Sequence, residues 1–200
     1  TQNEIRKLLG LGARMATRQE LRPFEIPSLQ GALRRSVVQI QRPRADGGSW
    51  WASGIIFAVD EVSYFVLTTN HLIPSKQVAP DDQPMRIIPY DSPPQTVDWQ
   101  DIFYRNAGLD LAAFRMDKQS ADWKSLPLAD GPLLSDDTLF IAGAYSDAAP
   151  TVYQGSFRNI IDLNEGYFNP ELYPGMCGAA VLDIDGGLIG MVLGGSSISN

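Results

Sequence analysis

Short apolar runs separated by turn-forming residues are the feature of this sequence that most constrains its fold. The runs are rich in β-branched and aromatic residues, and Gly, Pro, Asp and Ser separate them. Many short strands with no helical period between them are typical of an all-β barrel or sandwich. We therefore predict strands in SVVQIQ, SWWASGIIFAV, SYFVLTTNHL, MRIIPY, LDLAAFRM, DTLFIAGAY, TVYQGSFRNIID, GAAVLDI and LIGMVLGG.

The N-terminal segment has a different pattern. Apolar residues recur at helix-like spacing between Ile5 and Met15, charged residues lie between them, and Pro23 follows. We predict a short helical extension over residues 1–32 that packs on the rest of the chain or on a protein partner. It holds no motif of catalytic residues, so we expect it to take no part in chemistry.

Composition excludes several classes of function. The net charge of −7 argues against nucleic acid as a partner, because phosphate binding needs a basic surface. A single Cys forms no internal disulfide, which favours a reducing compartment inside the cell. One Cys and one His cannot supply a structural zinc site, and we expect no metal and no cofactor. No run approaches the roughly 20 apolar residues of a membrane span, so we expect no membrane association.

Three short motifs carry residues suited to nucleophilic catalysis. TTNHLIP contains the only histidine, His71; GLDLAAF contains Asp110; and PGMCGAAV contains the only cysteine, Cys177. An imidazole can take a proton from a thiol and later return it to a leaving amine, and a carboxylate can orient that imidazole. Gly175 and Gly178 allow the sharp turn that aims backbone N–H groups at a developing oxyanion.

Each of these residues also has a plainer interpretation. Cys177 could be a small apolar core residue, and His71 an ordinary surface or core residue. Asp110 could be a turn residue at the start of a strand, in which case Asp98 and Asp101 are the competing carboxylates.

The three motifs in this order resemble the chymotrypsin-like peptidases, the double β-barrel family that includes the HtrA-type proteases. The resemblance rests on SWWASGIIF followed by TTNHL, on LDLAAF, and on PGMCGAAVLDIDGGLIGMVLGG, and it covers residues 33–195. It implies an all-β fold of two antiparallel, six-stranded-type β-barrels with the active site between them. The first barrel would span residues 33–118 and the second residues 119–200, and together they would form one peptidase domain.

The resemblance also implies a reaction. Cys177 would form a covalent acyl-enzyme with a polypeptide substrate, His71 would act as base and then acid, and Asp110 would orient His71. The backbone N–H groups of Gly175 and Cys177 would form the oxyanion hole.

The identity of the nucleophile leaves alternatives open. Cys177 stands where most members of the family have Ser, which resembles the viral chymotrypsin-like cysteine proteases. The chain is then either a cysteine peptidase or a serine-type peptidase whose Ser is replaced by Cys. The alternative of a different class is a catalytically silent protease fold that acts in binding or regulation.

By the same resemblance, the substrate-binding wall corresponds to Leu193, Gly194 and Gly195, next to Val192. Glu171 falls near the position where trypsin-like members carry a carboxylate that selects Lys or Arg, although it could simply be a solvated surface residue. A further strand normally follows the segment LIGMVLGG in this family, whereas here SSISN follows it. Either the chain stops short of this strand, or it was cut there, or the strand comes from elsewhere, with a protein partner or the N-terminal segment as the possible source.

Overall fold

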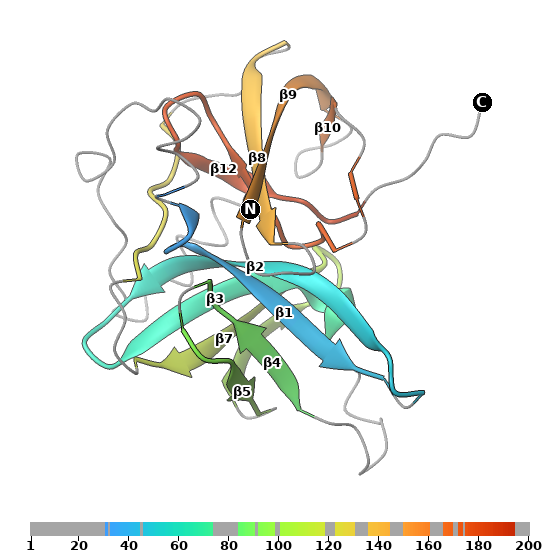
Figure 1. The fold of residues 1–200 in the computed structure, drawn as a ribbon. Coiled ribbons are helices and arrows are strands. Elements are labelled where there is room, and N and C mark those ends of the chain that lie inside the picture. The colour runs from blue at the N-terminus through green and yellow to red at the C-terminus, as the bar shows by residue number, and fades with distance from the viewer. Residues whose placement is uncertain are drawn as a thin grey trace.

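The computed structural model describes residues 31, 33–44, 46–73, 84–90, 92–98, 101–118, 123–130, 136–144, 150–160, 166–169, 172–173 and 175–194. The predicted N-terminal helix and the C-terminal end after Gly194 lie outside these residues. Strands form most of the described chain and helix is almost absent from it, which confirms the all-β prediction (Figure 1). No helix in this described part is long and apolar enough to cross a membrane.

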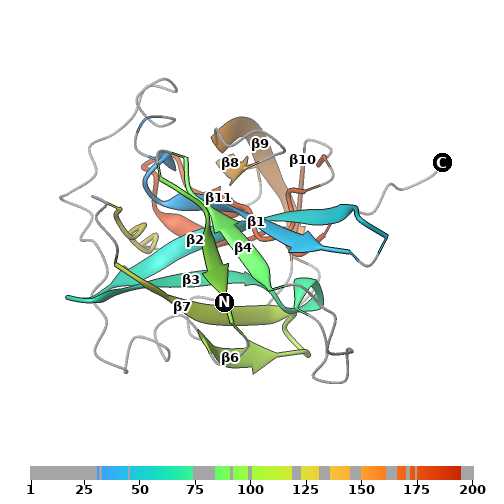
Figure 2. The same ribbon diagram turned by 60° about the horizontal axis from the view of Figure 1, so that its bottom comes forward.

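The first sheet contains seven antiparallel strands in the order β5-β4-β1-β2-β3-β7-β6. Figure 2 shows that this sheet is strongly curled. Its strands are β1 (Val37–Pro43), β2 (Ser49–Val59), β3 (Ser63–Thr69), β4 (Met85–Ile88), β5 (Gln95–Val97), β6 (Ile102–Asn106) and β7 (Leu111–Asp117).

The second sheet contains five antiparallel strands in the order β10-β9-β8-β11-β12. It forms the upper half of the molecule in Figure 1, above the first sheet. Its strands are β8 (Thr138–Ala144), β9 (Pro150–Ile160), β10 (Gly166–Asn169), β11 (Ala180–Leu182) and β12 (Leu188–Met191).

The described chain has three clusters of buried apolar residues, one within each sheet and one between the two sheets. One lies within the first sheet and includes Ile56, and another lies within the second sheet and includes Ile141. The third contains residues of both sheets, among them Ile55 and Ala142, and it forms the interface between the two halves. Because successive side chains of a strand point to opposite faces, β2 places Ile55 in the interface and Ile56 inside its own sheet.

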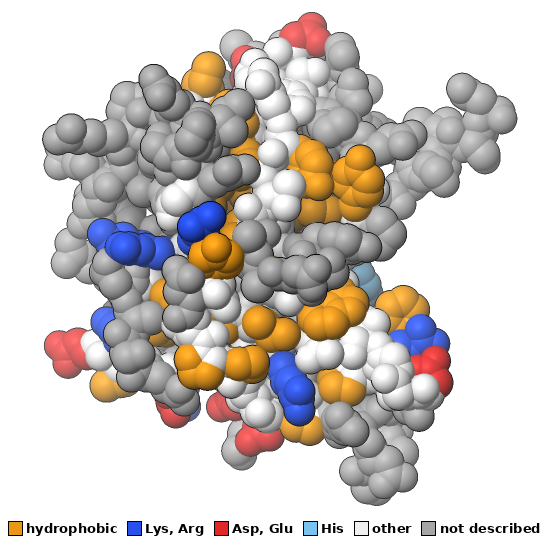
Figure 3. Space-filling model, in the orientation of Figure 1, with side chains coloured by type: hydrophobic (Ala, Val, Ile, Leu, Met, Phe, Trp, Pro, Cys, Tyr) orange, Lys and Arg blue, Asp and Glu red, His pale blue; other side chains and the backbone are white. Residues whose placement is uncertain are grey.

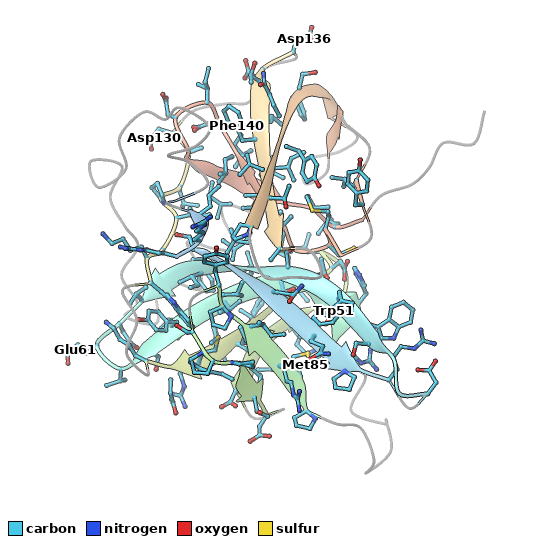
Figure 4. All side chains as sticks on the ribbon, in the orientation of Figure 1. Trp51, Glu61, Met85, Asp130, Asp136 and Phe140 are labelled. Carbon is cyan, nitrogen blue, oxygen red and sulfur yellow. The ribbon has the colours of Figure 1, made fainter. Side chains whose placement is uncertain are left out.

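Residues 123–130 connect the two halves. Trp123 packs in the cluster of the first sheet, with its ring 4.8 Å from the ring of Tyr64. Further along, Leu128 forms an isolated parallel bridge with Leu188 of β12. Figure 4 shows the resulting arrangement, with Met85 on β4 in the lower half and Phe140 on β8 in the upper half.

The observed strands differ from the predicted ones in instructive ways. The three strands that the sequence did not indicate, β5, β6 and β10, have only three to five residues each. The strand predicted through the histidine ends at Thr69, and a 3-10 helix, η2 (Asn70–Leu72), follows it. The number of closed barrels and the boundary between them stay predictions.

Candidate active site

His71 lies on the short helical turn η2, directly after β3. β3 pairs with β7 along its whole length, and Thr69 at its end lies opposite Leu111 at the start of β7. This register brings the turn that carries His71 next to Asp110. The His71 side chain is 52% exposed, and Figure 3 shows the pale blue of histidine at the surface where the upper and lower halves meet.

Asp110 holds His71 through two hydrogen bonds. Its Oδ2 lies 2.6 Å from the ring Nδ1, and its Oδ1 accepts the backbone N–H of His71 at 2.8 Å. Because an ionised carboxylate only accepts, Nδ1 carries the proton in this pair. In the neutral tautomer with its proton on Nδ1, the other ring nitrogen, Nε2, can accept a proton.

The backbone of Asp110 is part of the same arrangement. Its φ of +50° is a left-handed conformation, which Asp adopts more readily than most residues. Its carbonyl oxygen accepts the backbone N–H of Asn70 at 2.9 Å. Asp110 therefore fixes the histidine turn with both its main chain and its side chain, whereas Asp101 accepts the backbone N–H of Asp98.

Arg105 of β6 stabilises this turn from another direction, a contact that no sequence motif indicated. Its Nε donates to Oδ1 of Asn70 at 2.8 Å, and a second guanidinium nitrogen donates to the carbonyl oxygen of Ile73 at 3.4 Å. An arginine within an exposed strand pattern carries no sequence signal for such a contact.

Cys177 lies in a tight loop of the second half that rests against β2. Its carbonyl oxygen accepts the backbone N–H of Ser53 at 2.7 Å. Gly175 and Gly178 have φ angles of +94° and +83°, a left-handed backbone that favours glycine. The sequence prediction that these glycines permit a sharp turn is thereby confirmed.

Two of the backbone N–H groups in this loop donate to no other described residue. Met176 N–H donates to the carbonyl of Tyr173, and Gly178 and Ala179 N–H donate to the carbonyls of Val192 and Met176. The N–H groups of Gly175 and Cys177 have no such acceptor within the described chain. These are the two donors that the resemblance assigned to an oxyanion hole.

The environment of Cys177 keeps its thiol protonated. Burial raises the pKa of the Cys177 thiol above its ordinary value, and the negative charge of Asp110 raises it further. A hydrogen bond from its own backbone N–H lowers that pKa by a smaller amount. The hydrogen bonds from Ser53 N–H to the Cys177 carbonyl and from Thr68 Oγ1 to the Ser53 carbonyl link the loop of Cys177 to β3, the strand that ends at the histidine turn.

The predicted substrate-binding residues are only partly described. Val192 is buried, Leu193 is half-buried, and Gly194 is exposed with nothing within 4 Å of the position of an added Cβ. Glu171 and Gly195 lie outside the described residues. The open position at Gly194 agrees with a wall that has no large side chain.

Comparison with known proteins identifies the family of this chain. The trypsin-like peptidase domain family matches residues 52–191. No curated protein sequence matches the chain.

Two solved structures resemble the fold. One is a serine endoprotease from Yersinia pestis, with a TM-score of 0.62 and 21% identity, covering 84% of this chain and 58% of that chain. The present chain thus spans little more than half of that relative. The other is the inactive form of a serine-to-alanine mutant of Rv3671c from M. tuberculosis H37Rv, with a TM-score of 0.61 and 15% identity, covering 82% of this chain and 79% of that chain.

The family match spans the strand that precedes the histidine, the His71–Asp110 pair and the loop of Cys177. The chain belongs to the trypsin-like peptidase domain family, and it has a chymotrypsin-like fold.

Proposed function

We propose that the chain is an endopeptidase that cleaves polypeptides through a covalent acyl-enzyme on Cys177, with His71 and Asp110 completing a triad. The observation that carries the proposal is the His71–Asp110 pair, in which the carboxylate binds both the ring Nδ1 and the backbone N–H of His71. This pairing leaves Nε2 as the proton acceptor and fixes the plane of the ring. A triad needs the same orientation of its imidazole.

The raised pKa of Cys177 determines how the nucleophile forms. A thiol with a raised pKa is neutral at pH 7, so a standing thiolate–imidazolium pair is not the resting state. His71 instead takes the thiol proton as the sulfur attacks the substrate carbonyl carbon. The resulting imidazolium, held by Asp110, then gives that proton to the leaving amine as the C–N bond breaks.

The negative charge on the carbonyl oxygen needs donors that are already in place. The backbone N–H groups of Gly175 and Cys177 can accept this role, because neither donates to another described residue. Donors fixed before the reaction stabilise the transition state without a cost of reorganisation. A water molecule then attacks the thioester carbonyl while His71 removes a proton from it; the C–S bond breaks, His71 returns the proton to the Cys177 sulfur, and the acid product leaves.

This general-base route is the one that a serine would use, and it bears on the origin of the nucleophile. The site suits either a cysteine peptidase or a serine-type peptidase with Cys in place of Ser. Turnover by Cys177→Ser distinguishes them: a more active serine variant favours the serine-type ancestry, and an inactive one favours a cysteine peptidase.

Cleavage of a peptide library tests the proposed function. We expect wild-type protein to cleave internal peptide bonds, and Cys177→Ala and His71→Ala to cleave none. Folded wild-type protein that cleaves nothing in a broad library would favour the catalytically silent alternative. The same library gives the specificity: cleavage after Lys or Arg that is lost in Glu171→Gln would assign Glu171 to the binding pocket.

A further inference from the structure

Ser53 in the middle of β2 is the residue around which the loop of Cys177 is organised. It is fully buried, at 0% exposure, and every polar atom that it has forms a hydrogen bond. Its backbone N–H donates to the carbonyl of Cys177 at 2.7 Å, and its hydroxyl donates to the carbonyl of Gly175 at 3.2 Å.

The remaining bonds of Ser53 connect it to both halves of the molecule. Its Oγ accepts the backbone N–H of Ala144, at the end of β8, at 3.0 Å. Its carbonyl oxygen accepts the Oγ1 hydrogen of Thr68, three residues before His71, at 2.8 Å. One buried serine thus joins the nucleophile loop, the second sheet and the strand that leads to the histidine.

These contacts determine which way the peptide groups of the loop face. The carbonyl oxygens of Gly175 and Cys177 both turn toward Ser53, and the N–H groups of Met176 and Gly178 in the same two peptide units donate to other carbonyls. Rotation of the peptide that follows Gly175 would break its bond to the Ser53 hydroxyl. The hydroxyl therefore holds the turn in which the N–H groups of Gly175 and Cys177 donate to no other described residue.

The backbone around Ser53 packs closely against it. A Cβ added to Gly178 would lie 2.0 Å from the Ser53 carbonyl oxygen, and one added to Gly143 would lie 3.0 Å from its hydroxyl oxygen. Loss of the hydroxyl would leave the carbonyl of Gly175 and the N–H of Ala144 without their partner in a buried place.

We propose that Ser53 is a positioning residue for the oxyanion-binding loop, and that its hydroxyl sets the orientation of the Gly175 and Cys177 N–H groups. This inference rests on the proposed function of that loop. Ser53 touches no reacting atom and acts through the Gly175 carbonyl.

The test compares two reactions of Cys177 in Ser53→Ala. Acylation by p-nitrophenyl acetate needs an oxyanion hole: the sulfur adds to the ester carbonyl, the oxyanion collapses, and p-nitrophenolate leaves with a thioester on Cys177. Alkylation by iodoacetamide needs none, since the sulfur displaces iodide at a saturated carbon. We expect Ser53→Ala to slow acylation on the order of 10²-fold, because a donor misplaced by about 1 Å costs that much, and to leave alkylation unchanged.

Ser63→Ala is the matched control. Ser63 is also a buried serine, at 3% exposure, but it lies at the opposite end of β3 from the histidine turn. We expect both reactions of Ser63→Ala to match those of the wild type. Equal slowing of acylation and alkylation in Ser53→Ala, or slowing of neither, would overturn the inference.

Hydrogen exchange of the loop amides decides the inference without any activity. We expect the amides of residues 176–179 to exchange faster in Ser53→Ala than in the wild type or in Ser63→Ala. Unchanged exchange would overturn the positioning role of Ser53. Wild-type protein that p-nitrophenyl acetate fails to acylate would count against the proposed function instead, and the exchange result would still decide the role of Ser53.

Discussion

Gly178→Ala provides a sharp test of the nucleophile loop. Gly178 has a φ of +83°, and an added Cβ would lie 2.0 Å from the carbonyl oxygen of Ser53, a backbone atom within a central strand. Real Cβ atoms essentially never approach closer than 3.0 Å, so the loop and β2 would have to move apart. That movement breaks the bonds that join the loop to its neighbours.

The magnitude follows from these contacts. A non-glycine residue in the left-handed region costs about 1–2 kcal/mol. Separation of the loop from its neighbours also weakens the hydrogen bonds from Ser53 N–H to Cys177 and from Gly178 N–H to Val192, each of which contributes about 0.5–1.5 kcal/mol. We therefore expect Gly178→Ala to lower the free energy of unfolding by roughly 2–5 kcal/mol.

Urea denaturation and peptide cleavage measure the two consequences. Gly190→Ala on β12 is the control, because nothing lies within 4 Å of its added Cβ and its backbone is not left-handed. It should be neutral or slightly stabilising, since alanine is more favourable than glycine within a strand by about 0.5–1 kcal/mol. A Gly178→Ala protein that unfolds at the wild-type urea concentration and cleaves at the wild-type rate would refute this description of the loop.

Three further outcomes are expected. The rate of Cys177 alkylation by iodoacetamide should rise with pH with a midpoint above that of an ordinary cysteine, because burial and Asp110 raise its pKa; rapid alkylation at pH 6 would contradict this. Asp110→Asn should lower the midpoint of alkylation, because it removes a negative charge near the thiol. The same variant should slow peptide cleavage by about 10⁴-fold, which is the cost of this change in a serine-peptidase triad, and an unchanged cleavage rate would exclude Asp110 from the triad. Gln39→Met should raise the free energy of unfolding by about 1 kcal/mol in urea denaturation, because the buried Nε2 of Gln39 has no hydrogen-bond partner among the described residues; a lower stability would indicate that its amide is satisfied.

The pairing of His71 with Asp110 could be predicted from the sequence, because each residue lies in a short local motif. The chain has one histidine, and it follows an apolar strand in a short motif, so few alternatives existed. Ser53 gave no signal, because its role depends on a contact with Gly175, which lies 122 residues away in the chain. The same reason applies to Arg105, whose partner in η2 is 35 residues distant.

Strand prediction succeeded for long apolar strands and failed for short ones. β2 was predicted with its observed bounds, since its eleven residues are apolar on both faces and strand formers dominate it. β5 has three residues and β6 alternates between partly buried and exposed positions, and in both strands pairing with a neighbour decides the conformation. Local sequence carries little information about such pairing.

Covalent capture of Cys177 tests the central claim most directly. Wild-type protein and His71→Ala are incubated with a panel of peptidyl chloromethyl ketones at pH 7, and the intact masses and the modified residue are determined by mass spectrometry. We predict one adduct per wild-type chain, on Cys177, and none on His71→Ala in the same time, because the neutral thiol needs the imidazole to remove its proton. Folded wild-type protein that gains no adduct, or equal labelling of Cys177 in both proteins, would contradict the account.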